Sequence, residues 1–340
     1  MNDKQKPIRF GVNFLPDQAL ELSDLVQLAE QLGFDIAGIG DSQSLFRDVY
    51  VCEALVAIST KSLRFGSRVI NPKTRHPAVA AGAAATLEEI APGRTMIGVS
   101  TGDSSVDNIG VRPATLAQFA GYIKSIRELL ATGSSVYDGS PCRLTWFRGR
   151  VPIYIAASGP KTLQLAGEIG DGVVINTGLA PEVIRDTINQ VKVGCARAGR
   201  NIDDVDMWWI PQANIADTKE QAIDEIAMTL ASAGSQLSRF TLEGKHLPPH
   251  LLSKVKTLGE RYNSGHHDKP EGSNGQLIKD LGLLDYLADR FAVAGTPQDC
   301  IRKLEAAIEA GARQFWMSFH FKEKARFMRA WAQGVIPAFR

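Results

Sequence analysis

Small polar residues end two apolar runs in the middle of the sequence, and their types suit the binding of a phosphate group. The run "IYIAAS" leads into Ser158-Gly159-Pro160, and the run "GVVIN" leads into Asn176-Thr177-Gly178. Glycines leave backbone N–H groups accessible, and a following helix N-terminus attracts an anion. The same residues also serve as ordinary turn and cap residues, so spacing alone leaves both interpretations open.

Polar and mostly uncharged side chains follow the other apolar runs too. No group of His, Asp and Glu has metal-ligand spacing, and no GxSxG nucleophile elbow is present. This pattern disfavours a metal site and a serine hydrolase, and it favours an organic cofactor that the protein positions. The residues at these run ends are Asn13, Phe14, Asp41, Ser42, Gln43, Arg68, Asn71, Ser100, Thr101, Gly102, Asp103, Gln212, Asn214, Ser318 and His320.

Apolar runs and helical patterns alternate along the whole chain. Strands are predicted at 8–15, 35–41, 63–71, 94–102, 153–158, 172–176, 205–216 and 312–320. Eight strand–helix units predict an α/β protein with a (β/α)8 TIM barrel, as one domain over residues 1–340. A doubly wound open sheet is the alternative, but no GxGxxG follows the first strand. Active sites of barrels lie at the carboxyl ends of the strands, which is where the polar residues stand.

Two stretches interrupt this alternation. Residues 137–150 predict a small hairpin or loop, and residues 235–290 predict an insertion near the barrel mouth, with short helices and many Pro, Gly and His residues. Such an insertion is typical of a lid or a substrate wall. His266 and His267 lie in it, and a histidine titrates near neutral pH, so either one is a candidate acid or base. A solvent-exposed polar loop explains them equally well.

Composition excludes several classes of partner. The chain has 340 residues, a formal net charge of +1 and no run rich in Lys and Arg, which argues against nucleic acid and against an anionic membrane surface. Its four cysteines are scattered, as in proteins with free thiols. The first residues lack the apolar core of a signal peptide, so a cytoplasmic protein is expected.

Five stretches, in order along the chain, resemble the bacterial-luciferase-like oxidoreductases, and among them the methylenetetrahydromethanopterin-reductase-like group. They are residues 40–51, 68–81, 91–104, 151–178 and 291–319. The resemblance implies a (β/α)8 barrel that binds a reduced flavin, or its deazaflavin analogue, with the ring against the end of the third strand. Members of the family often carry a non-proline cis peptide there, which by position falls between Arg68 and Val69.

The resemblance also implies roles for the strand-end residues. Several deazaflavin-dependent members place Asp-His after the second strand, whereas this chain has Asp41-Ser42. The proton donor is therefore unassigned, and Ser42 is a candidate catalytic residue together with His266 and His267. The expected cofactor contacts are Asp41, Arg68, Val69, Asn71, Thr101, Gly102, Asp103, Ser158, Gly159, Pro160, Asn176, Thr177 and Gly178. The expected substrate contacts are Phe14, Gln43, Arg47 and His320, although Phe14 also suits the core and Arg47 suits an ion pair with Asp48.

Two chemistries follow from this resemblance. The main prediction is a two-component monooxygenase, in which reduced FMN from a separate flavin reductase reacts with oxygen and a small organic substrate is oxygenated. The alternative is hydride transfer between the deazaflavin coenzyme F420 and the substrate. A non-catalytic flavin-binding protein is the alternative from another class. A homodimer or larger homo-oligomer is expected, since the aliphatic helix at 49–59 suits packing against a partner.

Overall fold

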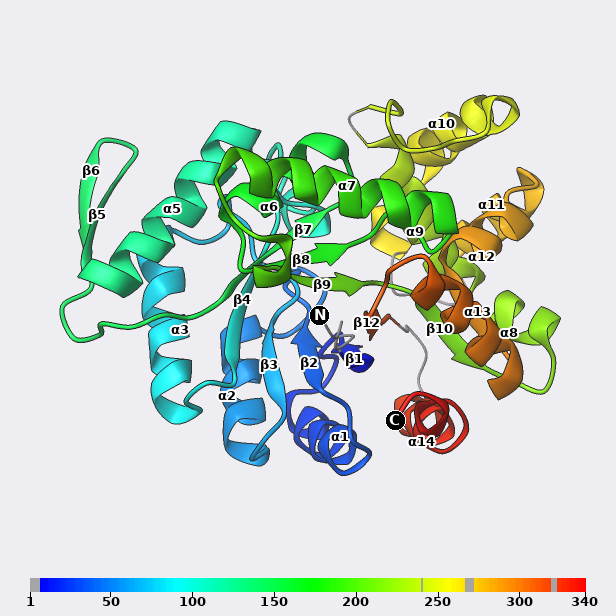
Figure 1. Cartoon of the computed structure of the whole chain (residues 1–340), viewed down its shortest axis with the longest axis horizontal. Helices are drawn as coiled ribbons and strands as arrows, with labels where there is room; N and C mark the ends of the chain where they lie inside the picture. The colour runs from blue at the N-terminus through cyan, green and yellow to red at the C-terminus, as the bar shows by residue number, and fades with distance from the viewer. Residues whose placement is uncertain (1–6, 240, 267–271, 319–322) are drawn as a thin grey trace, which may run out of the picture. The chain divides into compact units, whose positions relative to one another are not determined.

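Eight parallel strands close into a barrel in the computed structural model, which describes residues 7–239, 241–266, 272–318 and 323–340 (Figure 1). The strand order around the barrel is β1-β12-β9-β8-β7-β4-β3-β2, which confirms the predicted (β/α)8 fold. The barrel strands are β1 (Arg9–Phe14), β2 (Ile36–Ile39), β3 (Arg64–Ser67), β4 (Thr95–Val99), β7 (Ile153–Ala157), β8 (Gly172–Ile175), β9 (Asp206–Trp209) and β12 (Gln314–Met317).

Helices follow the barrel strands, and local signals fix where several of them begin and end. Pro77 lies in the first turn of α3, and Thr115 forms a capping box with Gln118 at the start of α5. Gly133 closes α5 with a left-handed φ of 81°. These helices are α1 (Ala19–Gln31), α2 (Val49–Ser59), α3 (Pro77–Ile90), α4 (Ser104–Asp107), α5 (Leu116–Thr132), α6 (Pro160–Ile169), α7 (Pro181–Arg197), α13 (Pro297–Glu309) and α14 (Lys324–Gly334).

The chain divides into two compact units. The N-terminal unit comprises Asn13–Ala156 and Ile169–Val173, and the C-terminal unit comprises Met1–Val12, Ala157–Glu168 and Val174–Arg340. Each unit is described separately below. The description of residues 1–340 as one domain stays a prediction.

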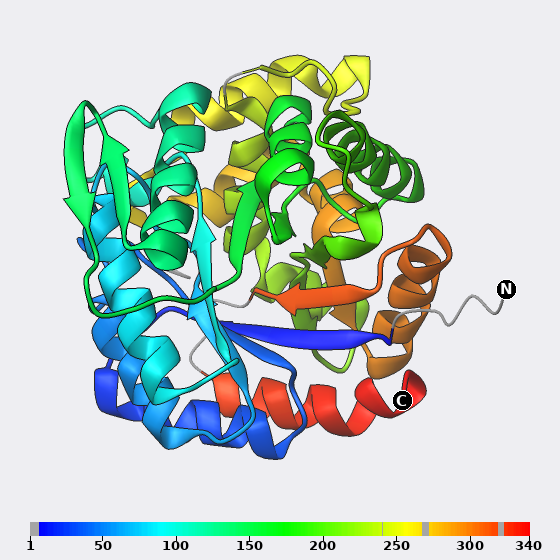
Figure 2. The ribbon, with the colours of Figure 1, turned by 60° about the vertical axis from the view of Figure 1, so that its left-hand side comes forward.

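Close strand approach in the N-terminal unit requires glycine at two positions. A Cβ atom on Gly66 of β3 would lie 2.0 Å from the carbonyl oxygen of Met96, and a Cβ on Gly98 of β4 would lie 2.0 Å from that of Ser67. Backbone therefore fills the space that side chains occupy elsewhere. The predicted hairpin is also present, as β5 (Ser134–Tyr137) paired with β6 (Ser140–Arg143), and β5 lies alongside α5 (Figure 2).

The prediction of one strand at 205–216, the seventh along the chain, is wrong. It is broken at Ile210-Pro211 into β9 and β10 (Gln212–Ile215), because Pro211 has no backbone N–H to donate. β10 instead forms a separate two-stranded parallel sheet with β11 (Ala292–Gly295), a strand that sequence analysis missed.

The helices between β10 and β11 share a hydrophobic core. This core includes Leu230, Leu258, Ile278, Leu287 and Phe291. Ile226 separates the first two helices, and the short helices predicted within 235–290 are present. The elements of this region are α8 (Lys219–Glu225), α9 (Ala227–Ser238), α10 (Leu252–Arg261), α11 (Ser273–Asp280) and α12 (Leu284–Phe291). Short 3-10 turns lie at Ile202–Asp204, Pro249–Leu251, Ser264–His266 and Ile336–Ala338.

Candidate functional site

A hydroxyl and amide network joins the strand ends of the N-terminal unit. The Ser42 hydroxyl, after β2, lies 2.9 Å from the Ser104 hydroxyl at the start of α4. The Gln43 amide nitrogen donates to the Ser105 carbonyl at 2.8 Å. The loops after β2 and β4 are therefore held together, which brings Ser42 and Gln43 to the loop that contains Thr101, Gly102 and Asp103.

Asn71, which follows β3, is fully buried and fully engaged. Its amide nitrogen donates to the Thr74 and Ser105 hydroxyls, and its carbonyl oxygen accepts from the backbone N–H groups of Lys73 and Thr74. These four bonds fix the turn at 71–74. The Asn71 side chain therefore stabilises this turn, and its contact with a cofactor ring stays a prediction.

The backbone at the end of β3 has the geometry that the family resemblance implies. The peptide bond between Arg68 and Val69 is cis. Nearby, Gly102 has a φ of 114°, and a Cβ atom there would lie 2.8 Å from Val106. Asp103 precedes α4, and the Thr101 carbonyl accepts a hydrogen bond from Ala114.

Arg75 is shared between two carboxylates near the end of β2. Its guanidinium lies 3.4 Å from Asp41 and 2.8 Å from Asp48. Burial raises the pKa of Asp41 in spite of this neighbour. Burial alone would also raise the pKa of Asp48, but hydrogen bonds from Arg75 and from the first turn of α2 hold it below its usual range. Asp41 is therefore the carboxyl of this pair that more readily holds a proton.

Glu53 is buried behind these groups on α2, with 1 % of its surface exposed. Its Oε1 atom has no hydrogen-bond partner among the described residues. Burial, followed by the charge of Asp41, raises the pKa of Glu53 well above its usual range. Sequence analysis missed Glu53 and Arg75. The available signal was a single acidic residue in the otherwise uncharged helix at 49–59.

The strand ends of the C-terminal unit have the form of an open cradle, which we define as residues 158–160 and 176–178. Asn176 donates its backbone N–H to the Ala157 carbonyl, which sets the two turns side by side. Its side-chain oxygen is buried and has no partner among the described residues. A Cβ atom on Gly159 would have no neighbour within 4 Å, so space is open there.

Thr177 and Gly178 contribute backbone rather than side chains to this cradle. The Thr177 hydroxyl lies 2.9 Å from the Thr187 hydroxyl on α7, so it is used inside the protein. Gly178 has a φ of 108°, and a Cβ atom there would lie 2.6 Å from Arg290.

The remaining predicted residues are more dispersed. Phe14 is buried, as a core residue is, and Arg47 is exposed. Asp48 pairs with Arg75, and the role of Arg47 in binding a substrate or another nearby carboxylate stays a prediction. The side-chain contact of His266 is with Ser273, inside the insertion. His267 and His320 lie outside the described residues.

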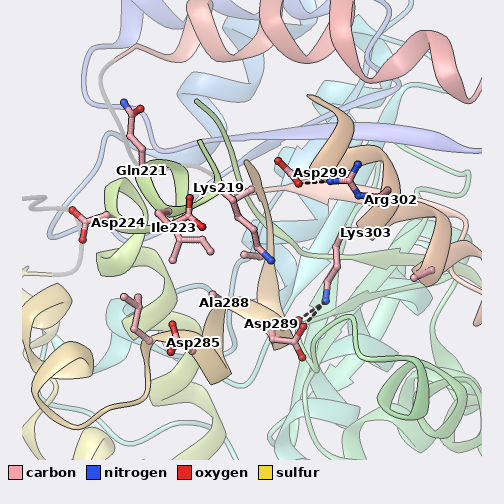
Figure 3. A pocket seen from close by; sticks show the side chains of 15 residues that line it. Lys219, Gln221, Ile223, Asp224, Asp285, Ala288, Asp289, Asp299, Arg302 and Lys303 are labelled. Atoms are coloured by element: carbon pink, nitrogen blue, oxygen red, sulfur yellow. Dashed lines mark hydrogen bonds and ion pairs between the residues drawn. The ribbon is translucent and has the colours of Figure 1, made fainter. Parts of the chain in front are cut away.

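Two cavities of the protein lie away from the cradle. The larger, of about 1010 Å³, lies in the C-terminal unit among α8, α12, β11 and α13, and the predicted site residues do not line it (Figure 3). Its charged walls include the Arg302–Asp299 and Lys303–Asp289 ion pairs. A second cavity of about 360 Å³ lies in the N-terminal unit beside Arg75 and the 71–74 turn. The described part of the chain holds no cluster of His, Cys, Asp and Glu that could bind a metal ion, and none of its helices is long and apolar enough to cross a membrane.

A family model described as luciferase-like monooxygenase matches residues 8–314. The chain belongs to the luciferase-like monooxygenase family. As a luciferase-like protein it is an oxidoreductase, as expected from the sequence.

Two curated relatives align along most of this luciferase-like chain. It is 32% identical to a 5,10-methylenetetrahydromethanopterin reductase of Methanolobus tindarius, over 90% of this chain and 92% of the relative. It is 28% identical to an F420-dependent glucose-6-phosphate dehydrogenase of Nakamurella multipartita, over 98% and 97% of the two chains. Among solved structures, the coenzyme F420-dependent tetrahydromethanopterin reductase of Methanopyrus kandleri has the same fold, with a TM-score of 0.77, 24% identity and coverage of 98% and 100%.

Proposed function

We propose that this chain is a deazaflavin-dependent oxidoreductase that transfers hydride between coenzyme F420 and a small organic substrate. The observation that carries the proposal is the near full-length similarity to relatives named for that coenzyme, at 28% identity over 98% of the chain. The methylenetetrahydromethanopterin reductase at 32% identity supports a reductase as well. This reverses the order expected from the sequence, where reduced FMN and oxygen came first.

The cradle of the C-terminal unit fits the side chain of such a coenzyme. The buried, unpartnered oxygen of Asn176 suits a hydroxyl donor. The open space at Gly159 and the first turn of α6 suit a phosphate group. When bound, the deazaflavin supplies the hydride donor or acceptor.

The N-terminal unit brings together groups of its own that can donate a proton. Ser42 and Ser104 share one hydrogen bond, so one of the two hydroxyls has a proton to offer to a substrate oxygen or nitrogen. Burial raises the pKa of Asp41, which is adjacent in sequence, so this carboxyl is a second candidate proton donor. Arg68 and Val69 provide backbone at the position where the resemblance puts the ring. The substrate and the oligomeric state belong to this proposal as well, and we expect a homodimer or a larger homo-oligomer. A separate flavin reductase belongs to the monooxygenase alternative.

A paired titration tests the coenzyme. The purified protein is mixed under nitrogen with reduced coenzyme F420 and, separately, with reduced FMN, while absorbance and fluorescence are followed. Preferential binding of the deazaflavin, with turnover that oxygen does not alter, is the expected result. Preferential binding of FMN, with a new absorbance band after oxygen is admitted, would replace the proposal with the monooxygenase. Tight binding with no turnover of any substrate would indicate a non-catalytic binding protein.

A further inference from the structure

Arg290 of α12 is buried at 3 % exposure and hydrogen-bonds to the cradle. Its Nε atom donates to the Thr177 carbonyl at 2.9 Å, and its own carbonyl accepts from the Leu179 N–H at 2.6 Å. Two hydrogen bonds therefore bracket Gly178, whose missing side chain leaves room for the arginine. Arg290 therefore contributes two of the hydrogen bonds that hold residues 177–179.

The same guanidinium holds the loop at 244–247. Its Nη2 atom donates to the Lys245 carbonyl at 2.7 Å, and Nη1 donates to the His246 carbonyl at 3.2 Å and to the Tyr286 hydroxyl at 2.8 Å. Gly244 of this loop lies against Pro160, the last residue of the other cradle turn, so a Cβ atom there would be 2.7 Å from the proline ring. Arg290 thus connects to both turns of the cradle.

A second buried cation lies in this loop. Lys245 is 5 % exposed, and its ammonium donates to the carbonyls of Gln236, Leu237 and Arg239 at the end of α9. Burial, and then repulsion from Arg290 and Arg239, lowers the pKa of Lys245 to about 8. The hydrogen bonds described for Arg290 and Lys245 go to carbonyl and hydroxyl oxygens. Their positive charge is therefore not neutralised by those partners, and it favours an anion in the cradle.

We infer that Arg290 is a positioning residue for the coenzyme phosphate. It fixes the Asn176–Gly178 turn and places a buried positive charge next to that turn. The inference rests on the proposed function. Four of the five N–H donors of the guanidinium are used within the protein, so Arg290 acts through the turn rather than as a direct phosphate ligand.

The test compares two probes on each protein variant: reduced coenzyme F420 and the same deazaflavin without its phosphate-bearing tail. The measured quantity is the ratio of the two Kd values from fluorescence titration. We expect wild type to favour the phosphorylated probe by roughly 100-fold. Arg290→Gln should reduce this ratio by roughly tenfold or more, and Arg290→Lys, which keeps the charge, should reduce it less.

Two further variants separate positioning from general stability. Tyr286→Phe removes one acceptor of Arg290 with little risk to folding, and it should lower the ratio by about two- to threefold. Arg94→Gln is the matched control, because Arg94 of the N-terminal unit also donates to backbone carbonyls, those of Leu63 and Ala57. It should lower thermal stability and leave the Kd ratio at the wild-type value.

Each outcome decides something. A ratio unchanged in Arg290→Gln and in Tyr286→Phe would overturn the inference and leave Arg290 a purely structural residue. Equal binding of both probes by wild type would overturn it too, while the proposed deazaflavin chemistry would stand. If wild type bound neither probe, the proposed function itself would fail, and the inference with it.

Discussion

The charge state of Glu53 can be tested through the stability of the fold. A carboxyl group that is 1 % exposed, with one oxygen lacking a hydrogen bond to any described residue, is far less costly to bury when protonated. Its folded-state pKa is therefore raised above the ordinary value of 4.5. For such a group the stabilising contribution is complete below the unfolded-state pKa, and it is lost as pH rises toward the folded-state pKa.

The size of the effect follows from this linkage. Each pH unit between the unfolded and folded pKa values changes the free energy of unfolding by about 1.4 kcal/mol. Above pH 5 wild type should therefore lose stability through Glu53 at up to about 1.4 kcal/mol per pH unit, for as long as the folded protein keeps the proton. Glu53→Gln has no proton to retain, so its free energy of unfolding should lack this decline.

Urea unfolding at pH 5, 6, 7 and 8, followed by tryptophan fluorescence, measures the difference. Glu30→Gln is the matched control, since burial raises the pKa of Glu30 but hydrogen bonds from Ser62, Leu63 and Lys61 outweigh it and lower the pKa to about 2. Glu30 is ionised throughout this range, so its variant should differ from wild type by a constant amount. Curves for wild type and Glu53→Gln that ran parallel from pH 5 to pH 8 would refute the reasoning, because Glu53 would then be ionised in the folded protein.

Three other outcomes are expected. Gly66→Ala should lower the free energy of unfolding, measured with urea, by about 1–3 kcal/mol or more, because its Cβ would overlap the Met96 carbonyl. Gly82→Ala on α3 is the contrasting variant: its Cβ meets no atom within 4 Å, so it should raise the free energy of unfolding by about 0.5–1 kcal/mol. Asp171→Asn should remove the acid-side loss of stability that its lowered pKa causes as pH falls below 5, measured by thermal unfolding from pH 3 to pH 7. Ile58→Glu, on an outward position of α2 that is 70 % exposed, should shift the expected dimer to monomer in sedimentation, and an unchanged species would exclude this face as the interface.

The architecture was predictable because each strand and helix has its own pattern of apolar residues along the sequence. The helix at 49–59 was predicted to the residue, and the barrel followed from eight alternations. The break at Ile210-Pro211 and the strand at 292–295 were not predicted, because a short apolar run does not reveal which neighbour it pairs with.

The candidate site was predictable only in outline. The strand-end residues came from the predicted strands, and their expected roles and the position of the cis peptide came from the family resemblance. Their hydrogen-bond partners were not predicted. Ser42 meets Ser104 across 62 positions of sequence, and Arg290 meets Thr177 across 113. Such contacts depend on how strands and helices are packed in space, and a single sequence carries no local pattern for them. The sequence did carry one signal, Glu53 in an otherwise aliphatic helix. It indicates a buried carboxyl group, but it does not indicate which residues lie near that group.

The parallel pairing of β10 with β11 has a consequence for how this protein can diversify. The whole helical region between them is a crossover connection between two adjacent parallel strands, with Gln212 opposite Ala292 and Ile215 opposite Gly295. Both of its attachment points are fixed by backbone hydrogen bonds outside the eight-stranded barrel. Any connection long enough to return to the start of β11 would satisfy those bonds, and about a dozen residues suffice. Strand pairing therefore leaves the length of this region free to change in evolution or design, and the contacts of Arg290 with Thr177 and Leu179 are what such a change must keep.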